Sequence, residues 1–128
     1  MKRFFFTTFA TLCVLLAMAQ SRVVLSSGDY DFGEIEETGG DVSCEFILKN
    51  ISAQPLVVSH MRSDCSCVTT RYSRKPIVPQ GVDTLRITFD PRFRAGVLNK
   101  KVYVYLSGDS LPTTLTIRGT VIGRSTKR

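Results

Sequence analysis

The stretch VSCEFILK, residues 42–49, alternates two kinds of side chain along its whole length. One set is apolar and the other is mostly polar: Val42, Cys44, Phe46 and Leu48 alternate with Ser43, Glu45, Ile47 and Lys49. Successive side chains of a β-strand point to opposite faces of a sheet, so this period of two predicts a strand with one buried face. The alternation also places the Cys44 side chain on the buried face.

Segments of the same kind recur on both sides of this strand, and helical periodicity is absent from them. Further strands are expected at residues 23–25, 30–35, 55–61, 67–72, 84–89, 101–106 and 114–122. Turn residues such as Gly39-Gly40 and Asp90-Pro91 separate them at intervals of about ten residues. The pattern predicts an all-β fold, an immunoglobulin-like antiparallel β-sandwich of seven to eight strands, with a barrel of similar strand count as the alternative.

Residues 1–19 have the three parts of a signal peptide for export. Two basic residues follow the first methionine, residues 4–19 are almost wholly apolar, and Ala17-Met18-Ala19 has the small-x-small pattern that a signal peptidase cleaves. The apolar run is shorter than the roughly 20 residues that a membrane span needs. We therefore expect cleavage before Gln20.

The expected cleavage leaves one β-sandwich domain, residues 20–122, and a polar tail, residues 123–128. Cys13 lies inside the leader and is discarded with it. We expect the mature protein in the periplasm or at the cell surface, attached to a membrane only if the leader is retained. These compartments are oxidising, so a disulfide is an expected feature of the domain.

Charge and motif content argue against nucleic-acid binding and against catalysis. The chain has 17 basic and 11 acidic residues, and this mild excess forms no stripe with interleaved aromatic side chains. His60 is the only histidine, and the sequence has neither a nucleophile elbow nor a phosphate-binding glycine loop. We therefore expect a protein that is not an enzyme, binds no nucleic acid and carries no cofactor.

Cys65 and Cys67 form the only local cluster of reactive side chains, and three interpretations of them remain open. In the first, one of them forms a disulfide with Cys44, which staples the domain and leaves one thiol free. In the second, the cysteines are buried and fill space as small apolar side chains. In an extended strand the two Cα atoms would lie roughly 6.5–7 Å apart, at the upper limit for a direct disulfide.

The third interpretation gives the cysteine pair a function of its own. A thiolate pair binds a soft metal such as Cu(I), or undergoes reversible oxidation. His60 and Met61 lie just upstream, and both are ligand types for copper, although their spacing from the cysteines matches no metal-binding motif. In this alternative function the chain is a periplasmic Cu(I)-binding or thiol-redox protein, with copper as the cofactor in the first case.

Tyr103 and Tyr105 are the candidates for a contact surface. They alternate with Val102 and Val104, so they point outward if the two valines face the core. Their position on a half-covered sheet face is the more ordinary explanation. The favoured function is a non-enzymatic exported module for protein interaction or structural support, whose partner is an unknown envelope protein that binds a strand edge or the end loops.

Several different short motifs follow one another along the chain after the leader. They are Asp31-Phe32-Gly33-Glu34-Ile35, Phe46-Ile47-Leu48-Lys49-Asn50, Pro55-Leu56-Val57-Val58, Cys65-Ser66-Cys67-Val68, Pro76-Ile77-Val78-Pro79 with Gly81, Gly96, and Leu115-Thr116-Ile117-Arg118-Gly119-Thr120-Val121. Together they resemble the bacterial domain-of-unknown-function family 1573. The resemblance implies an exported protein with an immunoglobulin-like sandwich, similar to the domains of cilia- and centrosome-associated proteins, and it implies no activity.

The chain departs from the family pattern at the cysteines. The family usually has Gly between the paired cysteines and Thr after them, where this chain has Ser66 and Val68, and Cys44 is not a family position. Any family role therefore carries over to the pair alone. Asn50-Ile51-Ser52 also matches the N-glycosylation acceptor pattern, but in a bacterial protein, which the resemblance implies, we expect no glycan there.

Overall fold

The computed structural model describes residues 22–123, which form eight β-strands. The strands are β1 (Val23–Leu25), β2 (Asp29–Glu36), β3 (Val42–Asn50), β4 (Val58–Ser63), β5 (Val68–Arg71), β6 (Val82–Phe89), β7 (Gly96–Leu106) and β8 (Thr113–Ile122). No helix capable of crossing a membrane occurs in this part of the chain. The expected signal peptide, with Cys13, and the polar tail beyond Gly123 lie outside the described residues.

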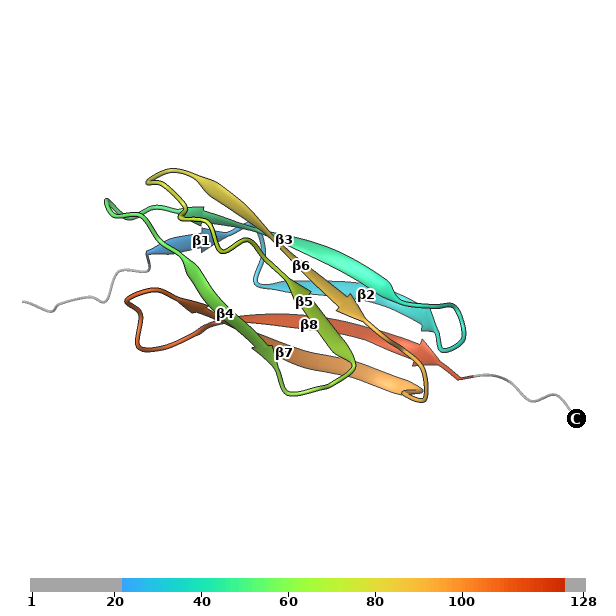
Figure 1. Cartoon of the computed structure of the whole chain (residues 1–128). Coiled ribbons are helices and arrows are strands. Elements are labelled where there is room, and N and C mark those ends of the chain that lie inside the picture. Colours follow the sequence, from blue (N-terminus) through green and yellow to red (C-terminus); the bar gives the residue numbers. More distant parts are fainter. Residues whose placement is uncertain (1–21, 124–128) are drawn as a thin grey trace, which may run out of the picture.

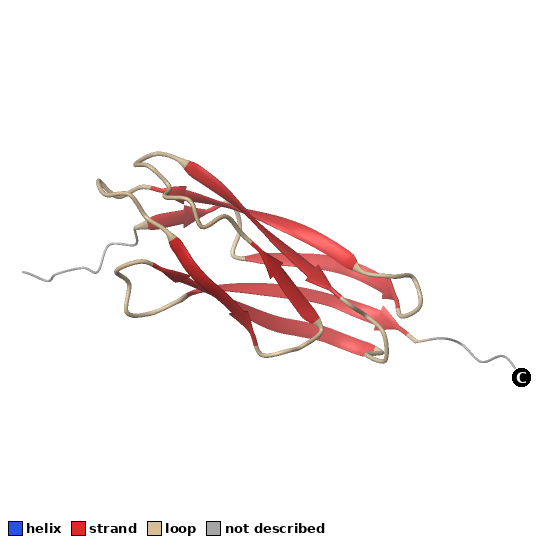
Figure 2. Ribbon diagram, in the orientation of Figure 1, coloured by secondary structure: helices blue, strands red, loops and turns tan. Residues whose placement is uncertain are grey.

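The strands form two four-stranded sheets that pack face to face (Figures 1 and 2). Sheet A has the order β1-β3-β6-β5, and sheet B has the order β2-β8-β7-β4. Two separate sheets with four edge strands confirm the predicted β-sandwich and exclude the closed barrel for this part of the chain. The eight strands also agree with the number expected from the spacing of the turns.

One strand pair departs from the predicted antiparallel arrangement. β2 lies parallel to β8, with Asp29 opposite Thr116 and Ile35 opposite Val121. Only three residues separate β1 from β2, and the chain crosses from sheet A to sheet B there without reversing its direction (Figure 1). β2 therefore enters sheet B beside β8 and runs in the same direction. Its register shifts at Gly33, whose φ of 69° is a conformation that suits glycine.

The core lies between the two sheets and is built from the apolar positions of the alternating segments. Its fully buried side chains include Phe46, Leu48, Leu56, Val58, Leu85, Ile87, Phe89, Val102, Val104, Leu115 and Ile117. Burial of this apolar surface is the main favourable term in folding. β7 begins at Gly96, five residues before the expected start, because Leu98 extends the buried set toward the β6–β7 loop.

Asn50 is the one fully buried polar side chain of residues 22–123. Its Nδ2 donates to the carbonyl oxygens of Gln54 and Ile77 at 2.8 and 2.9 Å, and its Oδ1 accepts from the backbone N–H and the hydroxyl of Ser52. Its backbone N–H and C=O pair with Gly81 and Gln80. Asn50 therefore fastens the β3–β4 loop and the β5–β6 loop to each other at one end of the sandwich.

Candidate functional site

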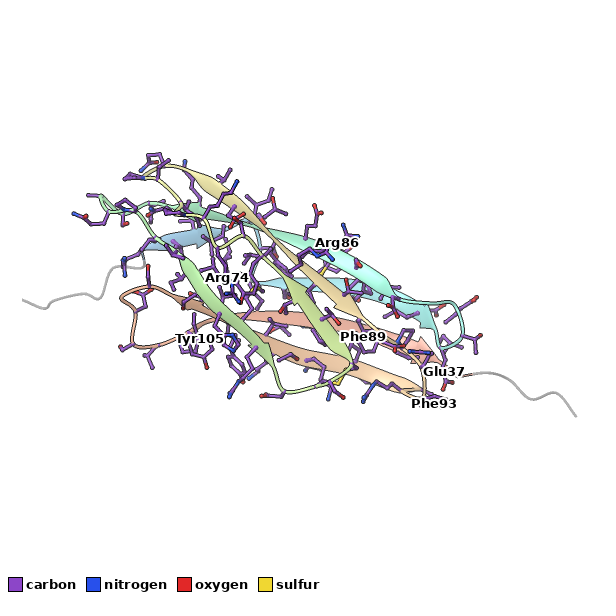
Figure 3. All side chains as sticks on the ribbon, viewed as in Figure 1. Glu37, Arg74, Arg86, Phe89, Phe93 and Tyr105 are labelled. Carbon is purple, nitrogen blue, oxygen red and sulfur yellow. A yellow bond between two sulfur atoms is a disulfide. The ribbon has the colours of Figure 1, made fainter. Side chains whose placement is uncertain are left out.

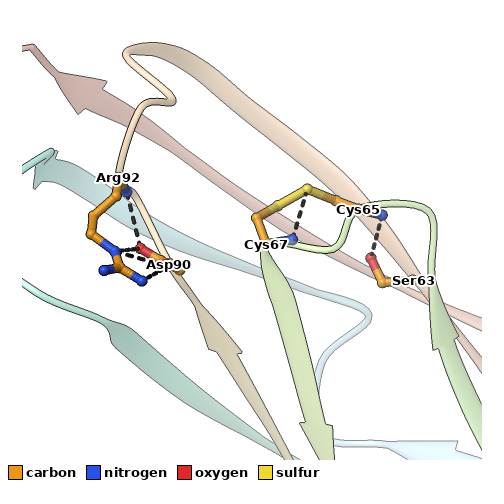
Figure 4. The surroundings of a disulfide bond; sticks show 5 residues. All are labelled: Ser63, Cys65, Cys67, Asp90 and Arg92. Carbon is orange, nitrogen blue, oxygen red and sulfur yellow. Dashed lines mark hydrogen bonds and ion pairs between the residues drawn. A yellow bond between two sulfur atoms is a disulfide. The ribbon is translucent and has the colours of Figure 1, made fainter.

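Cys65 and Cys67 lie in the turn that carries the chain from β4 in sheet B to β5 in sheet A, and they form a disulfide (Figure 4). The backbone N–H of Val68 donates to the Cys65 carbonyl at 3.2 Å, which closes the turn. The Cys67 N–H also donates to the Cys65 sulfur at 3.2 Å. Because the segment is a turn, the Cα atoms are only 5.1 Å apart, well within disulfide range.

The expected crosslink to Cys44 is therefore wrong. Cys44 is a free, buried cysteine on β3, and β6 lies between β3 and β5. Neighbouring strands are about 4.8 Å apart, so β3 and β5 are separated by about 9.6 Å, beyond the roughly 7 Å limit for a disulfide. The same separation applies to Cys67, which lies in line with β5. Its carbonyl accepts from the N–H of Asp90, the residue after β6, at 2.9 Å.

The observed disulfide does little to staple the domain as a whole. The stabilisation from a crosslink comes mainly from the loop that it closes in the unfolded chain, and this loop contains a single residue between the cysteines. The loop-closure relation gives about 1.6 kcal/mol for so short a loop, against about 3 kcal/mol for 15 residues. Both cysteines are buried in the core, as the space-filling interpretation expects, so the bond mainly fixes a turn between the sheets.

The arrangement does not support the copper-binding alternative. The two sulfurs are bonded to each other, and Met61 and His60 occupy opposite faces of β4. Met61 is buried in the core, whereas His60 is exposed on the outer face. Within residues 22–123, no three His, Cys, Asp or Glu side chains come together as a metal site would require.

We expect thiol reagents to distinguish the three cysteines. Burial raises the pKa of the Cys44 thiol to about 11, so at pH 8 about one molecule in a thousand carries the reactive thiolate. Without reductant, Cys44 should be alkylated only after unfolding in urea, and Cys65 and Cys67 should stay unlabelled, as read by peptide mass spectrometry. Alkylation of Cys65 or Cys67 in unfolded, unreduced protein would show that they are not bonded.

The same pKa shift makes the folding stability depend on pH. Between its ordinary value of 9.0 and about 11, the Cys44 thiol loses its proton in the unfolded chain but keeps it in the folded one. The unfolded chain therefore binds fewer protons in this window, and the free energy of unfolding falls as the pH rises through it. Cys44→Ala should remove this contribution.

The outer face of sheet B carries four exposed or half-exposed side chains that lie side by side on β4 and β7. Tyr105 is opposite His60, with ring centroids 5.8 Å apart, and Tyr103 is opposite Arg62, whose guanidinium carbon lies 5.9 Å from the ring centroid. We call these four residues the tyrosine face. The Tyr103 hydroxyl also lies 3.4 Å from an Asp64 carboxylate oxygen. Val102 and Val104 point the other way and are fully buried.

The sequence predicted that the two tyrosines point outward, but it did not place His60 or Arg62 beside them, and it grouped His60 with the cysteines. The alternation within β7 shows which side chains point outward, but it does not show which strand lies alongside. The antiparallel register of β4 and β7 brings His60 and Arg62 to the tyrosines. The sequence did carry a signal for the outer face of β4. His60, Met61 and Arg62 alternate polar, apolar and polar, and in the structure they are exposed, buried and exposed.

Comparisons with known proteins agree with this fold. The family model described as "Protein of unknown function (DUF1573)" matches residues 23–121. A search of curated proteins gives no match. Among solved structures, a protein of unknown function from Porphyromonas gingivalis W83 is similar with a TM-score of 0.67 at 18% identity, over 80% of this chain and 50% of that one. The chain thus spans half the length of that protein.

Two further solved structures show how widely the fold occurs. The PapD-like domain 7 of human CEP192, also called an ASH domain, matches with a TM-score of 0.61 at 16% identity, over 81% of this chain and 87% of that one. The Vibrio cholerae VesB protease matches with a TM-score of 0.60 at 11% identity, over 78% of this chain and 31% of that one. At these identities the likeness shows the fold alone.

Proposed function

The chain belongs to the DUF1573 family of proteins of unknown function, and from that premise we propose that it is an exported, non-enzymatic module that binds an envelope protein through its tyrosine face. The module holds its partner and performs no chemistry on it. The sandwich provides a rigid sheet from which the four side chains of the tyrosine face project.

The tyrosine face is the observation that carries this proposal. Tyr and Arg are enriched at the centres of protein interfaces, where large rigid side chains supply contact area at a low cost in conformational entropy. The two tyrosines are half-buried by their neighbours and contribute nothing to the core between the sheets. β4 is also an edge strand of sheet B, so a partner that covers the tyrosine face reaches unpaired backbone groups along the same strand.

The leader pattern and the disulfide support export. Residues 1–19 match the composition of a signal peptide, and a disulfide between Cys65 and Cys67 persists in an oxidising compartment outside the cytoplasm. The PapD-like domain of CEP192 supports the sandwich architecture of the module and does not identify its partner.

Site-specific photocrosslinking in the producing cell tests the proposal. A photoreactive phenylalanine analogue in place of Tyr105 should give a discrete crosslinked species, because that position lies at the centre of the proposed contact. The matched control carries the analogue in place of Thr84, which is exposed on the outer face of sheet A, and should give none.

The adduct from position 105 should also disappear when Arg62→Ala and Tyr103→Ala are added. Both side chains project from the outer face, so these changes leave the core intact and should lower the free energy of unfolding by less than about 1 kcal/mol. Equal crosslinking from positions 84 and 105, or no adduct from either, would contradict the proposal.

A further inference from the structure

Phe93 stands out at one end of the sandwich, in the loop between β6 and β7 (Figure 3). Its side chain is 94% exposed, more than any other large apolar side chain among residues 22–123. Its backbone has a φ of 61°, in the left-handed region that bulky side chains rarely adopt. Exposure and backbone conformation both count against Phe at this position for folding.

The loop holds Phe93 in place through its neighbours. The Arg92 guanidinium donates to both carboxylate oxygens of Asp90, at 2.8 to 3.1 Å, and Asp90 is itself tied to the disulfide turn through its N–H (Figure 4). The Arg94 N–H donates to the carbonyl of Pro91, which is buried. Arg92, Phe93 and Arg94, which we call the Phe93 tip, thus present an exposed aromatic ring on an ordered loop, with the Arg92 guanidinium held by Asp90.

A hollow of the opposite charge character lies on the outer face of sheet B. It has a volume of about 340 Å³ and is lined by Asp31, Gly33, Glu34, Val97, Leu98, Asn99, Arg118, Gly119 and Thr120. We call it the Gly33 hollow, because the bulge at Gly33 shifts β2 there and Gly33, where an added Cβ would meet no atom within 4 Å, brings no side chain to fill it. Asp31 and Glu34 supply carboxylates on its β2 side, and Arg118 is already paired with Asp29.

We propose that the Phe93 tip of one molecule docks into the Gly33 hollow of a second copy of this chain. The volume of the hollow falls in the range of pockets that bind small aromatic groups. The Arg92 guanidinium stays paired with Asp90, and the Arg94 guanidinium meets the carboxylates of Asp31 and Glu34, so the two surfaces are complementary in charge. A tip that fits a hollow elsewhere on the same chain makes a heterologous, head-to-tail contact, through which copies of the chain associate.

Sedimentation of the protein, purified as the cell produces it, tests this assembly over roughly micromolar to millimolar concentrations. The wild-type chain should associate, and Phe93→Gly should weaken the association at least tenfold. Glycine also removes the cost of the positive φ, so Phe93→Gly should melt no lower than wild type at concentrations where both are monomeric. Loss of association with no loss of stability separates docking from misfolding.

Gln80→Gly is the matched control. Among residues 22–123, Gln80 is the other non-glycine residue with a positive φ, 66°, and it lies away from the Phe93 tip in the loop before β6. This change removes the same kind of backbone cost without touching the tip or the hollow, so association should stay at the wild-type level. An equal loss of association in Gln80→Gly and Phe93→Gly would overturn the proposal.

A mixing experiment tests whether the tip and the hollow meet each other. Glu34→Lys reverses a charge at the rim of the hollow while leaving the tip intact, and Phe93→Gly removes the tip while leaving the hollow intact. Neither variant should associate alone, and an equimolar mixture should form the pair. The proposal is overturned if the wild type stays monomeric throughout, if mixing restores nothing, or if the monomer instead binds phosphatidylglycerol vesicles through Phe93.

Discussion

Phe46→Ala is expected to lower the free energy of unfolding by about 3–5 kcal/mol. Phe46 is among the largest fully buried side chains, with 1% of its surface exposed, and its partner across sheet A is the equally buried Leu85. Truncation removes the transfer free energy of the ring and leaves a cavity between two sheets that cannot collapse without losing their own pairing. Urea unfolding followed by circular dichroism measures the change.

Ile47→Ala is the matched control, because it removes an apolar side chain from the next residue of the same strand. Ile47 is 48% exposed on the outer face, so its truncation should cost less than about 1 kcal/mol. If Phe46→Ala fails to fold, Phe46→Leu gives a smaller effect of about 1 kcal/mol that can still be measured. Equal costs at positions 46 and 47 would mean that the assignment of faces in β3 is wrong.

Asn50→Leu is expected to lower the free energy of unfolding by about 3 kcal/mol although leucine is apolar and similar in size. The change removes four side-chain hydrogen bonds. It leaves the N–H of Ser52 without its partner and takes one of two donors from the Ile77 carbonyl, which keeps the N–H of Leu56. Groups left unpaired in this way bear the full cost of desolvation, which exceeds the gain from burying leucine.

Chemical unfolding of Asn50→Leu beside Asn99→Leu isolates the effect of the buried network. Asn99 is exposed on β7, so its replacement should change the free energy of unfolding by no more than about 0.5 kcal/mol. A crosslinking measurement confined to the loop around Ile77 should also show looser packing of that loop in Asn50→Leu than in the wild type. A cost at position 50 no larger than that at position 99 would show that the network contributes nothing.

The period-two pattern predicted the strands and their faces because burial decides both. In β3, β6 and β8 the buried residues are those that the alternation places inward, including Phe46, Ile87 and Leu115. Each of these assignments depends only on a strand's own residues. A sandwich has one interior, and an apolar stripe of period two has one way to face it.

Features that depend on two distant segments could not be predicted in the same way. The parallel partner of β2 is decided by the sheet change after Leu25, and neither strand's alternation carries that information. The disulfide forms because Cys65 and Cys67 lie in a turn, whereas an extended strand was expected. The loops that meet at Asn50 and the hollow at Gly33 likewise arise only when separate parts of the chain come together.

The parallel pairing of β2 with β8 has a consequence for the order of folding. Asp29 and Thr116 stand opposite each other although 87 positions separate them along the chain. β8 is also a central strand of sheet B, flanked by β2 and β7, so β2 has no partner strand in this sheet until β8 has been synthesised. Contacts between such distant segments are slow to form, because the entropy of closing a long loop is lost before they contribute. The emerging chain therefore cannot complete sheet B until β8 is available, although every strand of sheet A precedes β8.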